Sequence, residues 1–498
     1  MPDIGGLIGG FGNAVSALNL SMALLGALLG TLVGVLPALG PATTMAILLP
    51  LTVHLPPTAA VIMLAGIYYG AMYGGSTTSI LINVPGEVSS VVTCLDGYKM
   101  KLAGRPGPAL ALCAIGSFIG GTVATAMLSL LALPLAQVAL SFGAPEYLGL
   151  AFFSLASIVG LSGGSPLRGI IAGIVGIVLS MVGWDPLSSV ARLTFHPAFL
   201  SGLTVVPVFI GLFGVSEVMV LMEETGRPSM DKIGSLWPSR DELRRGLASS
   251  IRGTIIGSVL GLIPGMVAAA TAFLAYDVEK KISKYPEKFG TGVVEGVAAP
   301  ESANNATAVA GMVPLLSLGI PTSPALAVLL AALMIYGLQP GPMLFVREPA
   351  FAWTVVASVY IGNVACLILN LPLVGLWARL ALIPRQIMAP LILGICVVGA
   401  YADRNLVLDI WVAIGFGLFG YYMRKRGWPQ TPLVLGYILG TLFEKSFRQT
   451  LSMADNPFML MTQRPIAAGL IVAGCAAIVF SVWRESSATR VRLAEEGL

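Results

Sequence analysis

The segment Gly30-Thr-Leu-Val-Gly34-Val-Leu-Pro37 recurs later in the chain as Gly257-Ser-Val-Leu-Gly261-Leu-Ile-Pro264. Both copies have the spacing Gly-x3-Gly-x2-Pro, and both lie in apolar stretches. Proline ends or kinks a helix because it lacks a backbone donor, and inside a bilayer the freed polar groups are tolerated only where protein or a water-filled cavity receives them. The repeat therefore predicts two membrane-embedded broken helices, which in paired positions indicate the binding site of a transporter.

The composition is that of an integral membrane protein. Of the 498 residues, 56% are hydrophobic and 10% are charged, whereas soluble domains usually carry roughly 25% charged residues. Apolar stretches recur from Ala14 to Trp483, and many are long enough to cross a hydrocarbon core of about 30 Å. We therefore expect an all-α polytopic membrane protein with roughly 10–12 transmembrane segments.

The charges of the loops that follow the two copies indicate opposite orientations. In the first half, residues 51–58 contain no Lys or Arg, whereas the next polar stretch, 85–105, contains three. In the second half the order is reversed, since residues 276–288 contain four lysines and residues 339–349 one arginine. If basic loops face the cytoplasm, the two copies enter the membrane in opposite senses, so we expect inverted-topology repeats with broken or re-entrant helices.

The longest polar interval divides the chain into two membrane halves. It is rich in arginine, and we interpret it as a basic cytoplasmic linker whose charges set the orientation, with docking of a partner as the alternative. The expected parts are the first half 14–222 with a repeat unit at about 26–131, the linker 223–252, the second half 253–484 with a repeat unit at about 253–377, and a cytoplasmic tail 485–498.

Hydroxyl and glycine residues are concentrated in the first repeat unit. Thr43 and Thr44 follow the first break, and the glycine-rich stretch 68–79 predicts a second break. A helix that begins near Ser76 would present free N–H groups and the positive end of its dipole to an anion. The alternative is that these small residues pack one helix closely against another.

The stretch Ala299-Pro-Glu-Ser-Ala-Asn-Asn-Ala-Thr307 is the sharpest polar signal of the second unit. A carboxylate and two adjacent amides at membrane depth cost several kcal/mol unless they are satisfied, so such groups tend to line a pathway or bind an ion. Glu301 could take a proton or ligate sodium, whereas the amides could bind a substrate or an ion. The alternative is that Glu301 caps a helix at the membrane interface or pairs with a lysine.

The candidate site residues fall into two groups. Those expected to bind substrate offer hydroxyl or amide groups: Thr43, Thr44, Ser76, Thr77, Thr78, Ser79, Asn304, Asn305 and Thr307. Those expected to couple an ion or to break a helix are Pro37, Gly40, Pro85, Pro264, Gly265, Glu301, Gly319, Pro321 and Thr322.

Five segments are distinctive when taken together: Tyr68–Thr78, Val84–Glu87, Asp96–Tyr98, Ala299–Asn305 and Leu318–Pro321. With them the chain resembles the large membrane subunit of the tripartite tricarboxylate transporters, the TctA-type family, over about residues 26–443. The resemblance implies a carrier of the bacterial inner membrane that works with a small membrane subunit and a periplasmic solute-binding protein. It also implies import of tricarboxylates or related organic carboxylates on an ion gradient. Thr322 departs from the family pattern, which usually has glycine there.

The function that we expect is secondary active transport by alternating access, and the alternative is a passive anion channel or a carrier that acts without a binding protein. We expect no enzyme, because the sequence contains no His-Glu-x-x-His and no serine with a histidine plausibly near it. ATP-driven transport is also not expected, because Gly-x4-Gly-Lys-Ser/Thr does not occur. The five cysteines lack metal spacing, and no nucleic-acid role is indicated. We expect no cofactor and no metal other than a transported sodium ion, with sodium and proton both open as the coupling ion.

Overall fold

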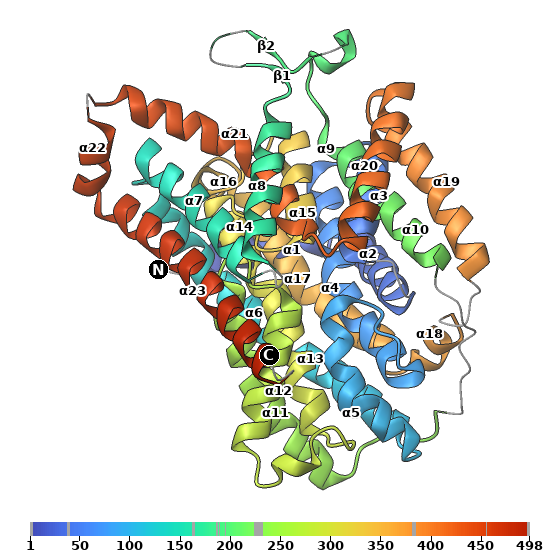
Figure 1. The fold of residues 1–498 in the computed structure, drawn as a ribbon. Helices are drawn as coiled ribbons and strands as arrows, with labels where there is room; N and C mark the ends of the chain where they lie inside the picture. Colours follow the sequence, from blue (N-terminus) through green and yellow to red (C-terminus); the bar gives the residue numbers. More distant parts are fainter. Residues whose placement is uncertain are drawn as a thin grey trace.

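The computed structural model describes residues 3–36, 40–161, 165–185, 188, 190–194, 196–223, 233–380, 385–454 and 456–495. In this part of the chain the structure is almost entirely helical (Figure 1). Eight helices are long and apolar enough to cross a membrane, which confirms an all-α polytopic membrane protein. They are fewer than the expected spans, because several apolar segments form helices shorter than 18 residues: Pro41–Thr52, Pro166–Ser180 and Pro324–Ile335.

The first half of the chain contains α1 (Ile4–Ala14), α2 (Ala17–Val35), α3 (Pro41–Thr52), α4 (Pro57–Ile82), η1 (Val88–Ser90), α5 (Val91–Leu102), α6 (Pro106–Ala139), α7 (Ala144–Leu161), α8 (Pro166–Ser180), β1 (Gly183–Trp184), β2 (Ala191–Arg192), η2 (Pro197–Phe199), α9 (Val205–Phe209), the π-helical η3 (Ile210–Val215) and α10 (Ser216–Glu223). The two strands pair antiparallel, with Gly183 opposite Arg192.

The second half contains α11 (Arg240–Gly261), α12 (Ala268–Ile282), η4 (Pro286–Lys288), α13 (Glu295–Ala310), α14 (Met312–Leu318), α15 (Pro324–Ile335), α16 (Pro342–Arg347), α17 (Pro349–Asn370), α18 (Val374–Leu380), α19 (Arg385–Arg404), α20 (Val407–Lys425), α21 (Gln430–Ser452), α22 (Pro457–Gln463) and α23 (Pro465–Glu495). The last helix thus continues well into the predicted C-terminal tail.

The two repeated glycine-proline segments coincide with helix ends, as predicted. The helix α2 ends at Val35 and α3 begins at Pro41, whereas α11 ends at Gly261 and α12 begins at Ala268. Pro264 lies between the second pair of helices, and Pro37 lies outside the described residues.

The glycines of α2 bring its backbone into direct contact with α4. A Cβ atom on Gly30 would lie 2.5 Å from the carbonyl oxygen of Ile67, and one on Gly34 would lie 2.3 Å from that of Ala71. The facing helix contributes glycines too, because a Cβ atom on Gly74 would lie 2.3 Å from the carbonyl oxygen of Thr31. Small residues at a helix interface allow this approach in membranes.

The prediction of a break within residues 68–79 is wrong, because α4 runs without interruption from Pro57 to Ile82. Ser76 therefore lies inside the helix, and the expected helix N-terminus near it does not exist. The physical reason is that the glycines of this stretch serve the contact with α2. This is the packing alternative that the sequence left open.

The second unit repeats the order of the first. Its α11 packs on α13 as α2 packs on α4, and a Cβ atom on Gly257 would lie 2.4 Å from the carbonyl oxygen of Ala303. The residues that follow α4 and α14 also correspond. Asn83 follows α4 with φ 56°, Gly319 follows α14 with φ 74°, and each is followed after one residue by a proline.

The two units are interleaved. The helix α6 of the first unit packs on α11 and α13, whereas α17 of the second unit packs on α2 and α4. Figure 1 shows α5 and α12 toward the lower end of the molecule and α3 and α15 higher up. In the order of the units, α3 corresponds to α12 and α5 corresponds to α15. Corresponding elements therefore lie at opposite ends of the molecule, as expected for the inverted repeat that the loop charges predict.

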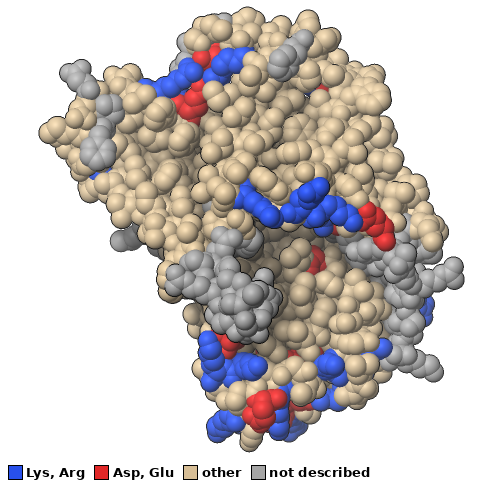
Figure 2. Space-filling view, in the orientation of Figure 1, with Lys and Arg blue, Asp and Glu red and all other residues tan. Residues whose placement is uncertain are grey.

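Around these units, the continuous apolar core includes buried side chains of α4, α15, α17, η3 and α21. Outside it, α23 packs on α7, and α21 packs on α7 and α8. Figure 2 shows that Lys and Arg gather at the lower end, in a row across the middle and near the upper edge of this face. The surface between the row and the upper edge is almost free of charge, as expected for contact with lipid.

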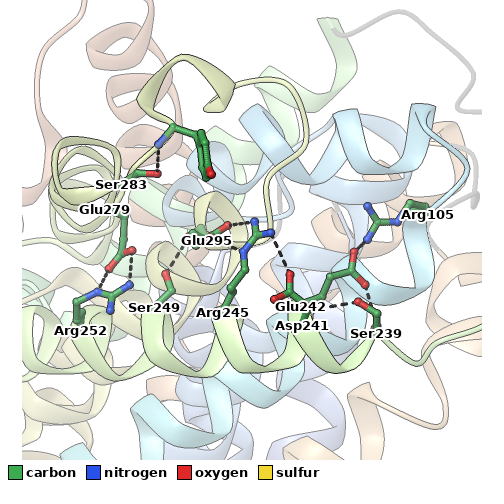
Figure 3. A network of polar contacts seen from close by, with 11 residues as sticks. Arg105, Ser239, Asp241, Glu242, Arg245, Ser249, Arg252, Glu279, Ser283 and Glu295 are labelled. Carbon is green, nitrogen blue, oxygen red and sulfur yellow. Dashed lines mark hydrogen bonds and ion pairs between the residues drawn. The ribbon is translucent and has the colours of Figure 1, made fainter.

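The helix α11 begins at Arg240, within the predicted linker. Ser239 and Glu242 form a capping box at its start, and two of the arginines that follow form ion pairs (Figure 3). Arg245 binds Glu295 of α13 at 2.7 Å, and Arg252 binds Glu279 of α12 at 2.5 Å. Part of the polar interval thus ties three helices of the second unit together, and the division into halves stays a prediction.

The contact between α2 and α4 yields a test of stability. We expect Gly30→Leu to lower the free energy of unfolding by about 1–3 kcal/mol or more, because the new side chain would meet backbone atoms that cannot move independently. Thermal unfolding of the purified protein in detergent measures this. The control is Gly415→Leu in α20, where a Cβ atom has no neighbour within 4 Å, and equal melting temperatures for the two variants would contradict the prediction.

Candidate functional site

The site is built on the turn that follows α4. Asn83 takes the left-handed conformation, and the chain then folds back so that the N–H of Gly86 donates to the carbonyl oxygen of Gly75 at 3.4 Å. A Cβ atom on Gly86 would lie 1.9 Å from the carbonyl oxygen of Gly34, so only glycine fits between α2 and α4. This close approach places the next residue, Glu87, against the buried face of α4, where its Cγ lies 2.8 Å from the Cβ position of Gly75.

Glu301 lies where three helices meet. Its side chain is buried in α13, and both carboxylate oxygens accept hydrogen bonds from hydroxyl groups of the first unit. Ser76 of α4 donates to Oε2 at 2.5 Å, and Thr93 of α5 donates to Oε1. Glu301 therefore joins the two units from the interior of the second.

A second carboxylate and two amides complete the cluster. Asn304 is fully buried, and its Nδ2 donates to Oε1 of the half-buried Glu87 at 3.2 Å. Its Oδ1 is buried, and no hydrogen-bond donor reaches it within the described residues. The neighbouring Asn305 donates to Oγ of Ser117 on α6 at 2.7 Å and to the backbone carbonyl of Glu301 at 3.2 Å.

The charges of the cluster suit a cation or a proton. Among the residues that the structure describes, neither Glu87 nor Glu301 forms an ion pair with a lysine or an arginine. The lysine pairing considered for Glu301 is thus absent from this part of the chain. Two carboxylates in a buried site repel one another, and a bound cation or proton relieves this cost. Carboxylate and amide oxygens are also suitable ligands for a hard cation.

The other predicted hydroxyl groups bond to the backbone rather than to this cluster. Thr43 donates to the carbonyl oxygen of Phe213 in η3 at 3.1 Å, and Thr44 to that of Gly40 at 3.3 Å. Thr78 and Ser79 both donate to the carbonyl oxygen of Gly75, at 3.3 and 3.0 Å. Thr307 donates to that of Ala303 at 2.7 Å, and Thr77 is buried on α4. The structure thus brings Ser76, Glu301, Asn304 and Asn305 together, and the substrate-binding roles stay predictions.

The predicted backbone breaks lie at the ends of helices. Gly40 is the N-cap of α3, and Gly265 has φ 84° between α11 and α12. Pro85 and Pro321 lie in the segments after α4 and α14. Thr322 is 2% exposed, and its Oγ1 would lie 2.3 Å from a Cβ atom on Gly311. The extra side chain of this residue therefore fills space beside a glycine at the junction of α13 and α14.

The sequence analysis missed three residues of the cluster. Glu87 lies in the quoted segment Val84–Glu87, and a carboxylate directly after a helix break was a signal that could have selected it. Thr93 and Ser117 carry no such signal. They lie 208 and 188 residues away from their partners in the chain, and only the packing of α5 and α6 on α13 places them at the site.

Comparison with known proteins shows the family to which the chain belongs. The profile of the tripartite tricarboxylate transporter TctA family matches residues 20–435. The chain is 43% identical over 476 residues to an uncharacterised 52.8 kDa protein encoded in the TAR-I ttuC' 3' region of Agrobacterium vitis, with 95% of each chain covered. It is also 39% identical over 211 residues to an uncharacterised protein of the TAR-II ttuC' 3' region of the same organism, covering 42% of this chain and 87% of the relative. No solved structure matches.

The profile spans both repeat units, the two broken-helix segments and every residue of the Glu87–Glu301 cluster. Because several of its helices are long and apolar enough to cross a membrane, the chain is a multi-pass membrane protein. The family match indicates that it is a transport protein. The chain therefore belongs to the tripartite tricarboxylate transporter TctA family.

Proposed function

We propose that this protein is the large permease subunit of a tripartite, binding-protein-dependent system that imports tricarboxylates or related organic carboxylates with a cation. The observation that carries the proposal is the buried cluster of Glu301, Glu87 and Asn304. It joins the two interleaved units, and it holds two carboxylates without an ion pair among the described residues.

In this proposal the coupling cation binds before the substrate. A polyanionic substrate that approached two ionised carboxylates would be repelled, and the repulsion is strong in a site of low dielectric constant. A sodium ion held by carboxylate oxygens and Asn304 Oδ1, or a proton taken up by one carboxylate, removes much of this repulsion. The substrate then binds nearby to hydroxyl and amide donors. This order explains why import depends on the ion gradient.

Alternating access follows from the position of the cluster. Ser76 and Thr93 come from the first unit and Glu301 from the second, so relative movement of the units changes the ligands of the ion. In secondary carriers of this kind, broken-helix repeats move against a scaffold around a site near the bilayer midplane. Here α7, α8 and α19 to α23 provide the surrounding helices of the proposed scaffold.

The partners and location are part of the same proposal. The family description names a tripartite system, and we infer a small membrane subunit and a periplasmic solute-binding protein as the other components. The protein would then lie in a bacterial inner membrane. The alternative function is a passive anion channel or a carrier that needs no binding protein.

One prediction of the proposed function concerns Glu301. In proteoliposomes with all three components, we expect Glu301→Gln to raise the cation concentration for half-maximal uptake by about tenfold or more, because a neutral amide replaces the charged ligand. The control is Glu146→Gln in α7, which alters a carboxylate that is also buried but binds Arg464 and the N–H of Gly143. Unchanged ion dependence of the Glu301 variant would remove Glu301 from coupling.

The second prediction separates a coupled carrier from a channel. We expect the initial rate of substrate uptake to saturate as the binding protein is added, and to collapse when the ion gradient is dissipated. The measurement is uptake of a radiolabelled carboxylate into proteoliposomes with and without an ionophore. Substrate flux that persists in both the absence of binding protein and the absence of a gradient would favour the passive alternative.

A further inference from the structure

The surroundings of Glu301, one of the proposed ion ligands, suggest a role for Asp96 of α5, a residue that the proposed function does not use. Asp96 is fully buried, and its carboxylate accepts hydrogen bonds from the second unit. The N–H groups of Gly290, Gly292 and Val293 donate at 3.0, 2.7 and 2.9 Å. The hydroxyl group of Tyr276 on α12 donates at 2.8 Å.

The loop before α13 is shaped to receive this carboxylate. Gly290 and Gly292 have φ values of 87° and 110°, a conformation that glycine adopts without a steric cost. Their N–H groups converge on one anion, as in other backbone sites for anions. A Cβ atom on Gly296 would lie 2.2 Å from Asp96 Oδ2, so a larger residue there would displace the carboxylate. These contacts form a clamp between α5 and residues 290–293.

The clamp lies one helical turn from the cluster. Thr93 precedes Asp96 by three residues on α5, and residues at this spacing lie on the same face of a helix. Thr93 is fully buried and donates to Oε1 of Glu301. On the neighbouring face, a Cβ atom on Gly97 would lie 2.8 Å from Cγ1 of Ile80, so α5 is also packed tightly on α4. A shift of α5 away from the loop would therefore move the Thr93 hydroxyl relative to Glu301.

We infer that Asp96 is a positioning residue, which clamps α5 onto residues 290–293 and thereby holds the Thr93 hydroxyl on Glu301. The inference rests on the proposed function, because it assigns the clamp an effect on the cation affinity of Glu301. Closing the clamp favours the arrangement in which Glu301 has its hydroxyl ligands. Opening it withdraws the Thr93 hydroxyl oxygen as a sodium ligand beside the Glu301 carboxylate and weakens sodium binding. The clamp thus links the relative position of the two units to sodium occupancy.

The test is a double-mutant cycle on Asp96 and Thr93 in the complete three-component system. Uptake is measured in proteoliposomes as sodium chloride is titrated at fixed pH. We expect Asp96→Asn and Thr93→Val each to raise the half-saturating sodium concentration on the order of fivefold or more. The double variant should be no worse than Thr93→Val alone, because both changes remove the same contact. Thr93→Ser should restore the wild-type value.

The control is Asp409→Asn in α20, which removes another fully buried aspartate, one that binds Arg404 in the surrounding helices. We expect it to lower the amount of folded protein without changing the half-saturating concentration. If Asp96→Asn prevents folding, Tyr276→Phe removes a single donor of the clamp and should shift the half-saturating concentration in the same direction by a smaller factor. Additive effects in the cycle, or an unchanged value for both clamp variants, would overturn the inference. If Glu301→Gln itself leaves ion dependence unchanged, the proposed coupling role of Glu301 fails instead.

Discussion

Direct contact between helix backbones is the constraint on which the rest of this structure depends. The glycines of α2 and α4 leave no room for a Cβ atom at their crossing, and α11 meets α13 in the same way. In a bilayer, helices gain little from burying apolar side chains against one another, so close packing and hydrogen bonds must supply the association energy. The approach of α2 to α4 also creates the narrow space that Gly86 fills, and this contact positions Glu87.

The protein satisfies its carboxylates differently inside and at the end of the molecule. At the start of α11, Glu295 and Glu279 bind arginines, and these pairs fasten α11 to α13 and α12 (Figure 3). In the interior, Glu301 receives neutral hydroxyl donors instead. A permanent arginine partner would neutralise the carboxylate and remove its attraction for a cation, whereas hydroxyl groups stabilise the negative charge of Glu301 only in part. The interior arrangement therefore leaves the Glu301 carboxylate able to bind the cation of the proposed mechanism, which a buried ion pair would prevent.

The short helix α5 connects these features. It belongs to the first unit, yet Asp96 binds backbone N–H groups of the second, and Thr93 contacts Glu301. Because one rigid helix carries both contacts, movement at the loop before α13 reaches the cluster without any large change of fold. In the proposed mechanism, such a connection between two discrete contacts lets relative motion of the units act directly on the proposed ion ligands.

The sequence by itself determined that this is a membrane protein, that helices end beside Gly34 and Gly261, and that the polar stretch at Glu301 is buried. These features follow from hydropathy, from proline and from polar residues within an apolar segment, all of which are local properties of the sequence. It could not distinguish glycines that break a helix from glycines that pack one helix against another. The break predicted around Ser76 is therefore absent, and the glycines there pack α4 on α2. Only the tertiary structure decided that Thr93, Asp96 and Ser117 belong beside α13. Their partners lie far away in the chain, and a hydroxyl or a carboxylate shows its role only when folding places a specific donor or acceptor within hydrogen-bond distance.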